Sequence, residues 1–200
     1  MRLAGAGWLC SALLPANAHA AYRPQTGDLV FHASRSAQSR AIQLATGSRY
    51  SHVGLMVLRH GQPYVYEAAG RVKFTAWADW VARGADGHFV ARRLKTPLTA
   101  TQQQQLRAAT ARYLGRPYDL AFAWNDRELY CSELVWKLYA NALHLRLAPL
   151  ARLGDFDLSH PIVQAKLRER YHGVVPKNEP VISPAALLAS PLLTPVGAEP

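Results

Sequence analysis

The sequence predicts one α+β domain, and three features of the chain support that prediction. Residues 53–58 form a short unbroken apolar run and residues 62–68 alternate in side-chain type, so both segments are expected to be strands. His60-Gly61 between them has the composition of a tight turn, which makes the pair a hairpin. Helical spacing of apolar residues appears in separate segments, most clearly after residue 130. The 200 residues, 50% of them hydrophobic, suffice for one core, and no repeat or linker divides them.

Strands and short helices alternate through the first half of the chain. Besides the hairpin, strands are expected at residues 28–31, 71–74 and 88–94. A helix is expected over residues 34–46, where Gly47 is its stop signal. Thr75 is expected to cap a short helix that carries Trp77, Trp80 and Val81.

The second half of the chain is expected to be mainly helical. Thr99-Ala100-Thr101-Gln102 is a capping-box pattern, and it predicts a helix that continues to Gly115. An aromatic-rich loop over residues 115–130 then precedes the helix that begins at Cys131. Shorter helices are expected over residues 161–170 and at Ser183-Pro184, and the tail from residue 193 is expected to fray.

The first twenty residues have the character of a secretory signal peptide. Met1-Arg2 supplies a positive charge, an apolar segment too short to span a bilayer follows, and Ala18-His19-Ala20 matches the small-x-small cleavage pattern. We therefore expect residues 1–20 to be removed, which leaves residues 21–200 as a single exported, periplasmic domain. A lipid anchor at Cys10 is the less favoured alternative, because Gly7-Trp8-Leu9 is a poor lipidation box.

The charge of the chain favours anionic partners. Lys and Arg number 23 against 13 Asp and Glu, a net charge of +10; loss of Arg2 leaves 22 against 13, or +9. Such a surface attracts cell-wall polymers or lipid headgroups. Nucleic acid is not expected, because the arginines are scattered and the chain is expected to be exported. No segment of the mature chain predicts a membrane span, and a monomer is expected.

Cys131 is the first candidate functional residue. Leu134, Val135, Leu138 and Tyr139 share one apolar helical face, which places the thiol at the N-terminus of that helix. Glu133 lies in the first turn, where a negative charge suits the helix dipole. Unpaired N–H groups and the positive end of the dipole favour thiolate, the nucleophilic form. Burial as a small core residue is the alternative, but signal cleavage leaves Cys131 as the mature chain's lone thiol.

The hairpin supplies a base for this thiol. A turn at His60-Gly61 makes paired residue numbers sum to 121, so Gly54 faces Glu67. His52 and Glu67 are then diagonal neighbours on one face of the sheet, within reach of long side chains. A one-residue slip would separate them, so the register is a testable claim. In this register Glu67 can orient His52 and stabilise its protonated form.

Zinc binding is the rival use of the same three residue types. The sequence contains neither a His-x-x-x-His nor a Cys-x-x-Cys spacing that would favour it, and a thiol at a helix N-terminus needs no metal to ionise. We therefore expect no metal and no cofactor.

These residues lie in a series of short motifs. The motifs are Gly27-Asp28-Leu29-Val30-Phe31, Ile42-Gln43-Leu44-Ala45-Thr46, Ser51-His52-Val53-Gly54, Val65-Tyr66-Glu67-Ala68, Tyr118-Asp119, Tyr130-Cys131-Ser132-Glu133-Leu134-Val135 and Ile182-Ser183-Pro184. Their order and spacing resemble those of the YiiX/YaeF/YebB-like cysteine hydrolases, the permuted branch of the NlpC-type papain-like superfamily, over residues 27–190. Several relatives in that family look like lipoproteins, whereas this chain lacks a good lipidation box.

The resemblance implies a circularly permuted papain-like fold, in which the cysteine helix packs on a small antiparallel sheet. It also implies Cys131 as nucleophile, His52 as base and Glu67 as the third member. The expected reaction is cleavage of an amide through a thioester acyl-enzyme. The oxyanion would meet the backbone N–H of Cys131, with Tyr130, Tyr118 or Gln43 as further candidates.

Three functions remain open on this basis. The first is an exported cysteine amidase or peptidase acting on cell-wall peptides. The second is a lipid acyl hydrolase or acyltransferase, because the permuted branch also resembles lecithin–retinol acyltransferase-like proteins. The third is a catalytically idle binding module, which a complete Cys/His/Glu set disfavours. The aromatic residues Tyr118, Phe122 and Trp124 are expected either to line the substrate cleft or to pack in the core.

Overall fold

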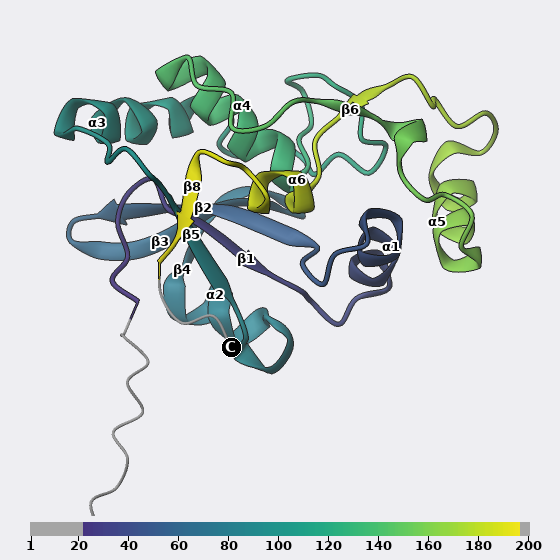
Figure 1. Cartoon of the computed structure of the whole chain (residues 1–200), viewed down its shortest axis with the longest axis horizontal. Coiled ribbons are helices and arrows are strands. Elements are labelled where there is room, and N and C mark those ends of the chain that lie inside the picture. The colour runs from purple at the N-terminus through teal and green to yellow at the C-terminus, as the bar shows by residue number, and fades with distance from the viewer. Residues whose placement is uncertain (1–21, 197–200) are drawn as a thin grey trace, which may run out of the picture.

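The computed structural model describes residues 22–196, and an antiparallel sheet lies at its centre (Figure 1). The order of the six strands is β4-β3-β2-β1-β5-β8. Their bounds are β1 (Leu29–His32), β2 (His52–Arg59), β3 (Gln62–Ala69), β4 (Arg71–Ala76), β5 (Val90–Leu94) and β8 (Leu193–Pro195). A second, two-stranded sheet pairs β6 (Ala151–Arg152) with β7 (Pro180–Val181).

Helices cover both faces of the central sheet. They are α1 (Ala37–Thr46), α2 (Trp77–Arg83), α3 (Ala100–Ala109), α4 (Cys131–Leu143), α5 (Pro161–Tyr171) and α6 (Pro184–Leu188). In Figure 1, α3 and α4 lie on one side of the sheet and α2 on the other, while α1 and α5 lie side by side beyond one end. The predicted α+β class is therefore confirmed. No helix within residues 22–196 combines the length and apolar character needed to cross a bilayer.

The hairpin between β2 and β3 has the predicted register. Arg59 pairs with Gln62 and Leu55 with Tyr66, so paired numbers sum to 121. His60 and Gly61 both have positive φ, 50° and 77°, which is the requirement of a tight primed turn. This turn geometry, together with burial of one face, fixes the register.

Alternation along the strands divides the core into two layers. Val53, Leu55 and Val57 of β2 belong to the larger layer, which they share with Leu134 and Leu138 of α4. The intervening Met56 faces the other side, where it packs in a smaller cluster with Val65 and Trp80. Each fully buried leucine contributes about 2 kcal/mol. The larger layer thus holds the N-terminal end of α4 against the sheet.

A buried ion pair anchors the start of β1. Both Asp28 carboxylate oxygens accept hydrogen bonds from Arg93 of β5, at 2.6 and 2.8 Å. Tyr22 donates a further hydrogen bond to Asp28 at 2.8 Å, and Asp28 is only 1% exposed. Tyr139 of α4 donates its hydroxyl to the Gly27 carbonyl. The Gly27-Asp28 motif therefore connects β1 to β5 and to α4.

Most of the expected elements are present, with three corrections. Thr75 does not cap α2: it lies within β4, and Ala76 is the N-cap without a side-chain hydrogen bond. The helix with the Thr99 capping box ends at Ala109, where a 3-10 turn replaces it. The tail does not fray from residue 193, because Leu193–Pro195 pairs with β5 as the edge strand β8. The predicted signal peptide lies outside the described residues and stays a prediction.

Candidate active site

Cys131 is the first residue of α4, as predicted, and it is 2% exposed. Tyr130 before it is extended, with φ −91° and ψ 166°. Three contacts hold this junction: Glu133 accepts the Tyr130 N–H at 3.3 Å, the Tyr130 hydroxyl accepts the Ile182 N–H at 3.1 Å, and Ser132 donates to the Ile182 carbonyl at 2.7 Å. The thiol therefore sits on a fixed backbone at the positive end of a helix dipole.

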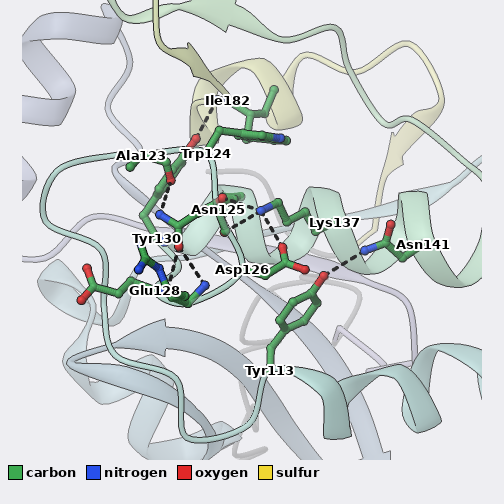
Figure 2. A network of polar contacts seen from close by, with 12 residues as sticks. Tyr113, Ala123, Trp124, Asn125, Asp126, Glu128, Tyr130, Lys137, Asn141 and Ile182 are labelled. Atoms are coloured by element: carbon green, nitrogen blue, oxygen red, sulfur yellow. Dashed lines mark hydrogen bonds and ion pairs between the residues drawn. The ribbon is translucent and has the colours of Figure 1, made fainter. Parts of the chain in front are cut away.

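A buried lysine fastens the preceding loop to α4 (Figure 2). The Lys137 ammonium lies 2.8 Å from Glu133 Oε1 and 2.8 Å from Asp126 Oδ1, and it donates to the Asn125 carbonyl at 2.6 Å. Burial raises the pKa of Glu133 to about 7, although Lys137 opposes the shift. Glu133 thus does more than the helix-dipole interaction predicted for it: it joins the loop, the cap and the helix.

Glu67 is completely buried and accepts hydrogen bonds from four side chains. Thr75 donates to Oε1 at 2.6 Å; His52 at 2.6 Å, Trp80 at 3.1 Å and Arg83 donate to Oε2. Burial alone would raise the pKa of Glu67, but hydrogen bonds from His52, Arg83 and Thr75 outweigh it and lower the pKa to about 2. A buried carboxylate is stable here because its lone pairs are occupied.

His52 lies between this carboxylate and the thiol. Its Nε2 contacts Glu67 at 2.6 Å, which leaves Nδ1 as the ring nitrogen available to Cys131. Burial opposes protonation of the ring, but the neighbouring Cys131 and Glu67 together raise the pKa of His52 to about 9. Burial also disfavours the thiolate, yet His52 and the N–H groups of Val53 and Ser132 bring the pKa of Cys131 below its usual range. The pair therefore favours thiolate and imidazolium at neutral pH.

Gly54 permits the close approach of the two strands beside His52. A Cβ at this position would lie 2.2 Å from Val65 Cγ1 and 3.5 Å from Glu67 Cβ. Any larger residue would have to displace the Val65 side chain, next to the Tyr66 carbonyl and Glu67. The glycine of the Ser51-His52-Val53-Gly54 motif is therefore part of the geometry that joins His52 to Glu67.

His32 is a further neighbour of His52 that the sequence did not predict. It pairs with His52 across β1 and β2, is 1% exposed and stacks on Trp80 with ring centroids 4.1 Å apart. Burial first, and then the positive charges of His52 and Arg83, lower the pKa of His32 to about 3. His32 is consequently a neutral spacer that holds His52 in place. A β1–β2 pairing inferred from the sequence would have placed His32 beside His52.

The remaining predicted site residues separate into two groups. Tyr118, Tyr130 and Phe122 line a cavity beside Cys131, and Tyr118 accepts a hydrogen bond from Gln38 at 2.8 Å. Gln43 lines neither this cavity nor the groove beside His52; its amide donates to the Arg49 carbonyl at 2.7 Å. Gln38, five residues earlier on α1, lies at the position expected of Gln43. The sequence alone does not distinguish which of the two glutamines on this helix faces the site.

Glu67 is expected to make folding sensitive to acid. Its pKa is near 4.5 when unfolded and about 2 when folded, so its contribution is present above pH 4.5 and disappears as pH falls towards 2. The shift corresponds to about 3 kcal/mol of unfolding free energy. Urea unfolding at successive pH values should show this loss of unfolding free energy, and Glu67→Gln should remove that part of its dependence on pH. Identical slopes in the two proteins would contradict the assignment.

Fold and site together define the class: a papain-like cysteine hydrolase, in which the histidine precedes the cysteine along the chain. Residues 23–197 match the family model described as "Permuted papain-like amidase enzyme, YaeF/YiiX, C92 family". The chain belongs to this family and shares its papain-like amidase character. The predicted permuted papain-like fold and the family resemblance are thus confirmed.

Two relatives illustrate the match. The uncharacterised protein YiiX of Escherichia coli K12 is 51% identical over 179 residues, which cover 90% of this chain and 89% of YiiX. The crystal structure of YiiX from Escherichia coli O157:H7 has 52% identity and a TM-score of 0.87, with coverage of 89% of this chain and 99% of that one.

The O157:H7 relative is described as a metalloprotein. Among residues 22–196 of this chain, no group of three or more His, Cys, Asp or Glu side chains is placed to hold a metal ion. Both ring nitrogens of His52 have protein partners, Glu67 and Cys131. The donor set of this site does not fit a metal, and we assign no step to one.

Proposed function

We propose that this protein is an exported cysteine amidase that cleaves its substrate through a Cys131–His52–Glu67 triad. The observation that carries the proposal is the continuous contact from a buried, fully hydrogen-bonded carboxylate through one imidazole to a thiol at a helix N-terminus. Nucleophile, base and orienting group are the three parts that such chemistry needs.

The mechanism follows from this arrangement. The Cys131 thiolate attacks the amide carbon, and the protonated His52 gives its proton to the departing nitrogen. Neutral His52 then takes a proton from water, which hydrolyses the thioester and restores the thiolate. Glu67 remains ionised throughout, because four donors hold its charge, and so acts as a positioning residue for the His52 ring.

Tyr118 and the helix N-terminus are the proposed oxyanion donors. Burial, and then the Cys131 charge, raise the pKa of Tyr118, so its hydroxyl keeps its proton. Because that hydroxyl already accepts from Gln38, its own hydrogen is available to a developing oxyanion. The Tyr130 hydroxyl also accepts a hydrogen bond, from the Ile182 N–H, but Tyr130 borders only the cavity beside Cys131, whereas Tyr118 borders the groove beside His52 as well and is therefore the better placed donor.

Alkylation of Cys131 should reveal the ion pair directly. An ordinary thiol has a pKa of about 8.5 and loses reactivity about tenfold per pH unit below it. Cys131 should instead react with iodoacetamide at nearly constant rate as pH falls from 8 to below 7, as followed by peptide mass spectrometry. His52→Ala should restore the ordinary profile. A wild-type rate that tracks a free thiol would refute the ion pair.

Substrate cleavage tests the proposed function itself. Wild type and Cys131→Ala should be incubated with purified peptidoglycan, with simple N-acyl amides and with a phospholipid panel, and the products identified by mass spectrometry. Amide cleavage that the variant lacks supports the proposal, with cleaved cell-wall peptides supporting that substrate. The apolar cavity beside Cys131 is the specific observation in favour of the second candidate, a lipid acyl hydrolase, which released fatty acid would support. Cleavage by both proteins alike would exclude the triad.

A further inference from the structure

Two hollows of different character meet at the candidate triad. Cys131 borders a narrow cavity of about 90 Å³, and His52 borders a wider groove of about 420 Å³. Neither residue borders the other hollow. Gln38, Ile42 and Tyr118 border both, so the two hollows are neighbours that share these residues as a common rim.

The cavity beside Cys131 is apolar. Its walls come from α1, α5 and the loop before α5, and include Ala41, Ala45, Phe156, Leu158, Val163 and Leu167. Two cations also border it, but both have partners: Lys166 lies 2.6 Å from Glu169, and the Arg170 guanidinium lies 4.8 Å from the Phe122 ring centroid. A narrow space with such walls favours an unbranched hydrocarbon chain over polar side chains.

The groove beside His52 is polar. Four serine residues border it, Ser34, Ser36, Ser39 and Ser51, together with Arg83. Its larger volume and its hydroxyl groups suit a bulkier group that forms hydrogen bonds. The two hollows therefore present different chemistry to the two halves of one substrate.

The reaction itself decides which half enters which hollow. The bond that forms joins Cys131 Sγ to the acyl carbon, so the acyl group must lie on the cysteine side. The bond that breaks is C–N, and the nitrogen receives its proton from His52, so the amine must lie on the histidine side. Water then adds to the acyl carbon, the C–S bond breaks, and the free acid leaves as thiolate and imidazolium reform.

We propose that the substrate is an N-acyl amide whose acyl group is an unbranched aliphatic chain held in the cavity, and whose amine is a polar group held in the groove. This inference rests on the proposed function. It adds the chemical class of the acyl group and of the amine, and the orientation of the substrate between the two hollows. A peptide substrate with a polar residue on the acyl side does not match it.

A series of substrates with acyl chains of increasing length tests whether the cavity binds the acyl group. N-acetyl, N-butyryl, N-hexanoyl and N-decanoyl derivatives of one amino alcohol should be compared by mass spectrometric product release. We expect kcat/KM to rise about two- to fourfold for each methylene until the cavity is filled. Acetamides of alkyl amines of the same lengths, which reverse the direction, should show no rise. A rise in the reversed series, or a flat direct series, would overturn the proposal.

Two matched variants locate the effect. Ala45 lines the cavity, whereas Ala37 is exposed on the same helix and borders neither hollow. Ala45→Phe should abolish the gain in kcat/KM with acyl-chain length. Ala37→Phe should keep the full gain. If the two variants behave alike, the cavity is not the acyl site.

A binding measurement separates failure of this inference from failure of the proposed function. Absence of Cys131-dependent cleavage of every amide would refute the amidase, but decanoate binding needs no turnover. Calorimetry should show that the Cys131→Ala protein binds sodium decanoate, that adding Ala45→Phe weakens the affinity tenfold or more, and that adding Ala37→Phe does not. No binding, or equal binding by both double variants, would overturn the acyl-chain assignment.

Discussion

Replacement of Cys131 by serine is expected to lower kcat/KM by about 10⁴-fold or more while the protein stays folded. The substitution keeps the shape of the side chain but replaces a thiol whose pKa is lowered by His52 and by two backbone N–H groups. A serine hydroxyl does not ionise in this environment, so the nucleophile is lost although His52 and Glu67 remain. Steady-state kinetics on the best amide substrate measure the effect.

The control for this variant is the adjacent buried serine. Ser132→Ala removes a hydrogen bond to the Ile182 carbonyl but leaves every backbone N–H of the first turn in place. We expect it to cost about 1 kcal/mol of stability and to keep kcat/KM within about tenfold of wild type. Retention of a tenth or more of the activity by Cys131→Ser would show that the thiol is not the nucleophile.

Glu67→Gln is expected to reduce kcat/KM by about 10²- to 10⁴-fold. An amide keeps the size of the carboxylate, and its NH₂ group can face the Thr75 hydroxyl, so the fold can accommodate it. The charge that helps to raise the pKa of His52 to about 9 is lost, and burial then disfavours the imidazolium. The alkaline limit of the kcat/KM profile should therefore move down by about one pH unit or more.

Thr75→Val is the matched control for Glu67→Gln. It removes one hydrogen bond from the same carboxylate without changing its charge. Activity should fall by about tenfold at most, since the net value of one such hydrogen bond is about 1.5 kcal/mol, and the alkaline limit should stay in place. If Thr75→Val shifts the pH profile as far as Glu67→Gln does, the charge of Glu67 is not what tunes His52.

The parts of the site that sequence predicted were those governed by local rules. A two-residue turn fixed the register of β2 and β3, and the register brought His52 and Glu67 together. Apolar spacing and the loop before it placed Cys131 at the start of α4. Periodicity and turn chemistry depend on a few neighbouring residues, so they can be recognised without knowledge of the tertiary fold.

The parts that were missed depend on contacts between distant segments. Arg83 and Trp80 reach Glu67 from α2, and nothing in their own sequence distinguishes them from surface or core residues. Thr75 is a residue type that often caps helices, yet it pairs with Val65 in the β3–β4 ladder and belongs to the sheet. The edge strand β8 likewise forms because β5 offers an open edge, which a prediction from the tail alone does not consider.

The order of the elements along the chain has a consequence for biosynthesis. The hairpin that carries His52 and Glu67 leaves the ribosome before the segment that carries Cys131. Until α4 packs on the sheet, its thiol has neither the imidazole nor an ordered helix N-terminus beside it, and it behaves as an ordinary, weakly nucleophilic cysteine. In the proposed mechanism, the reactivity of Cys131 is therefore acquired only when the fold is complete, and the nascent chain is protected from its own chemistry until then.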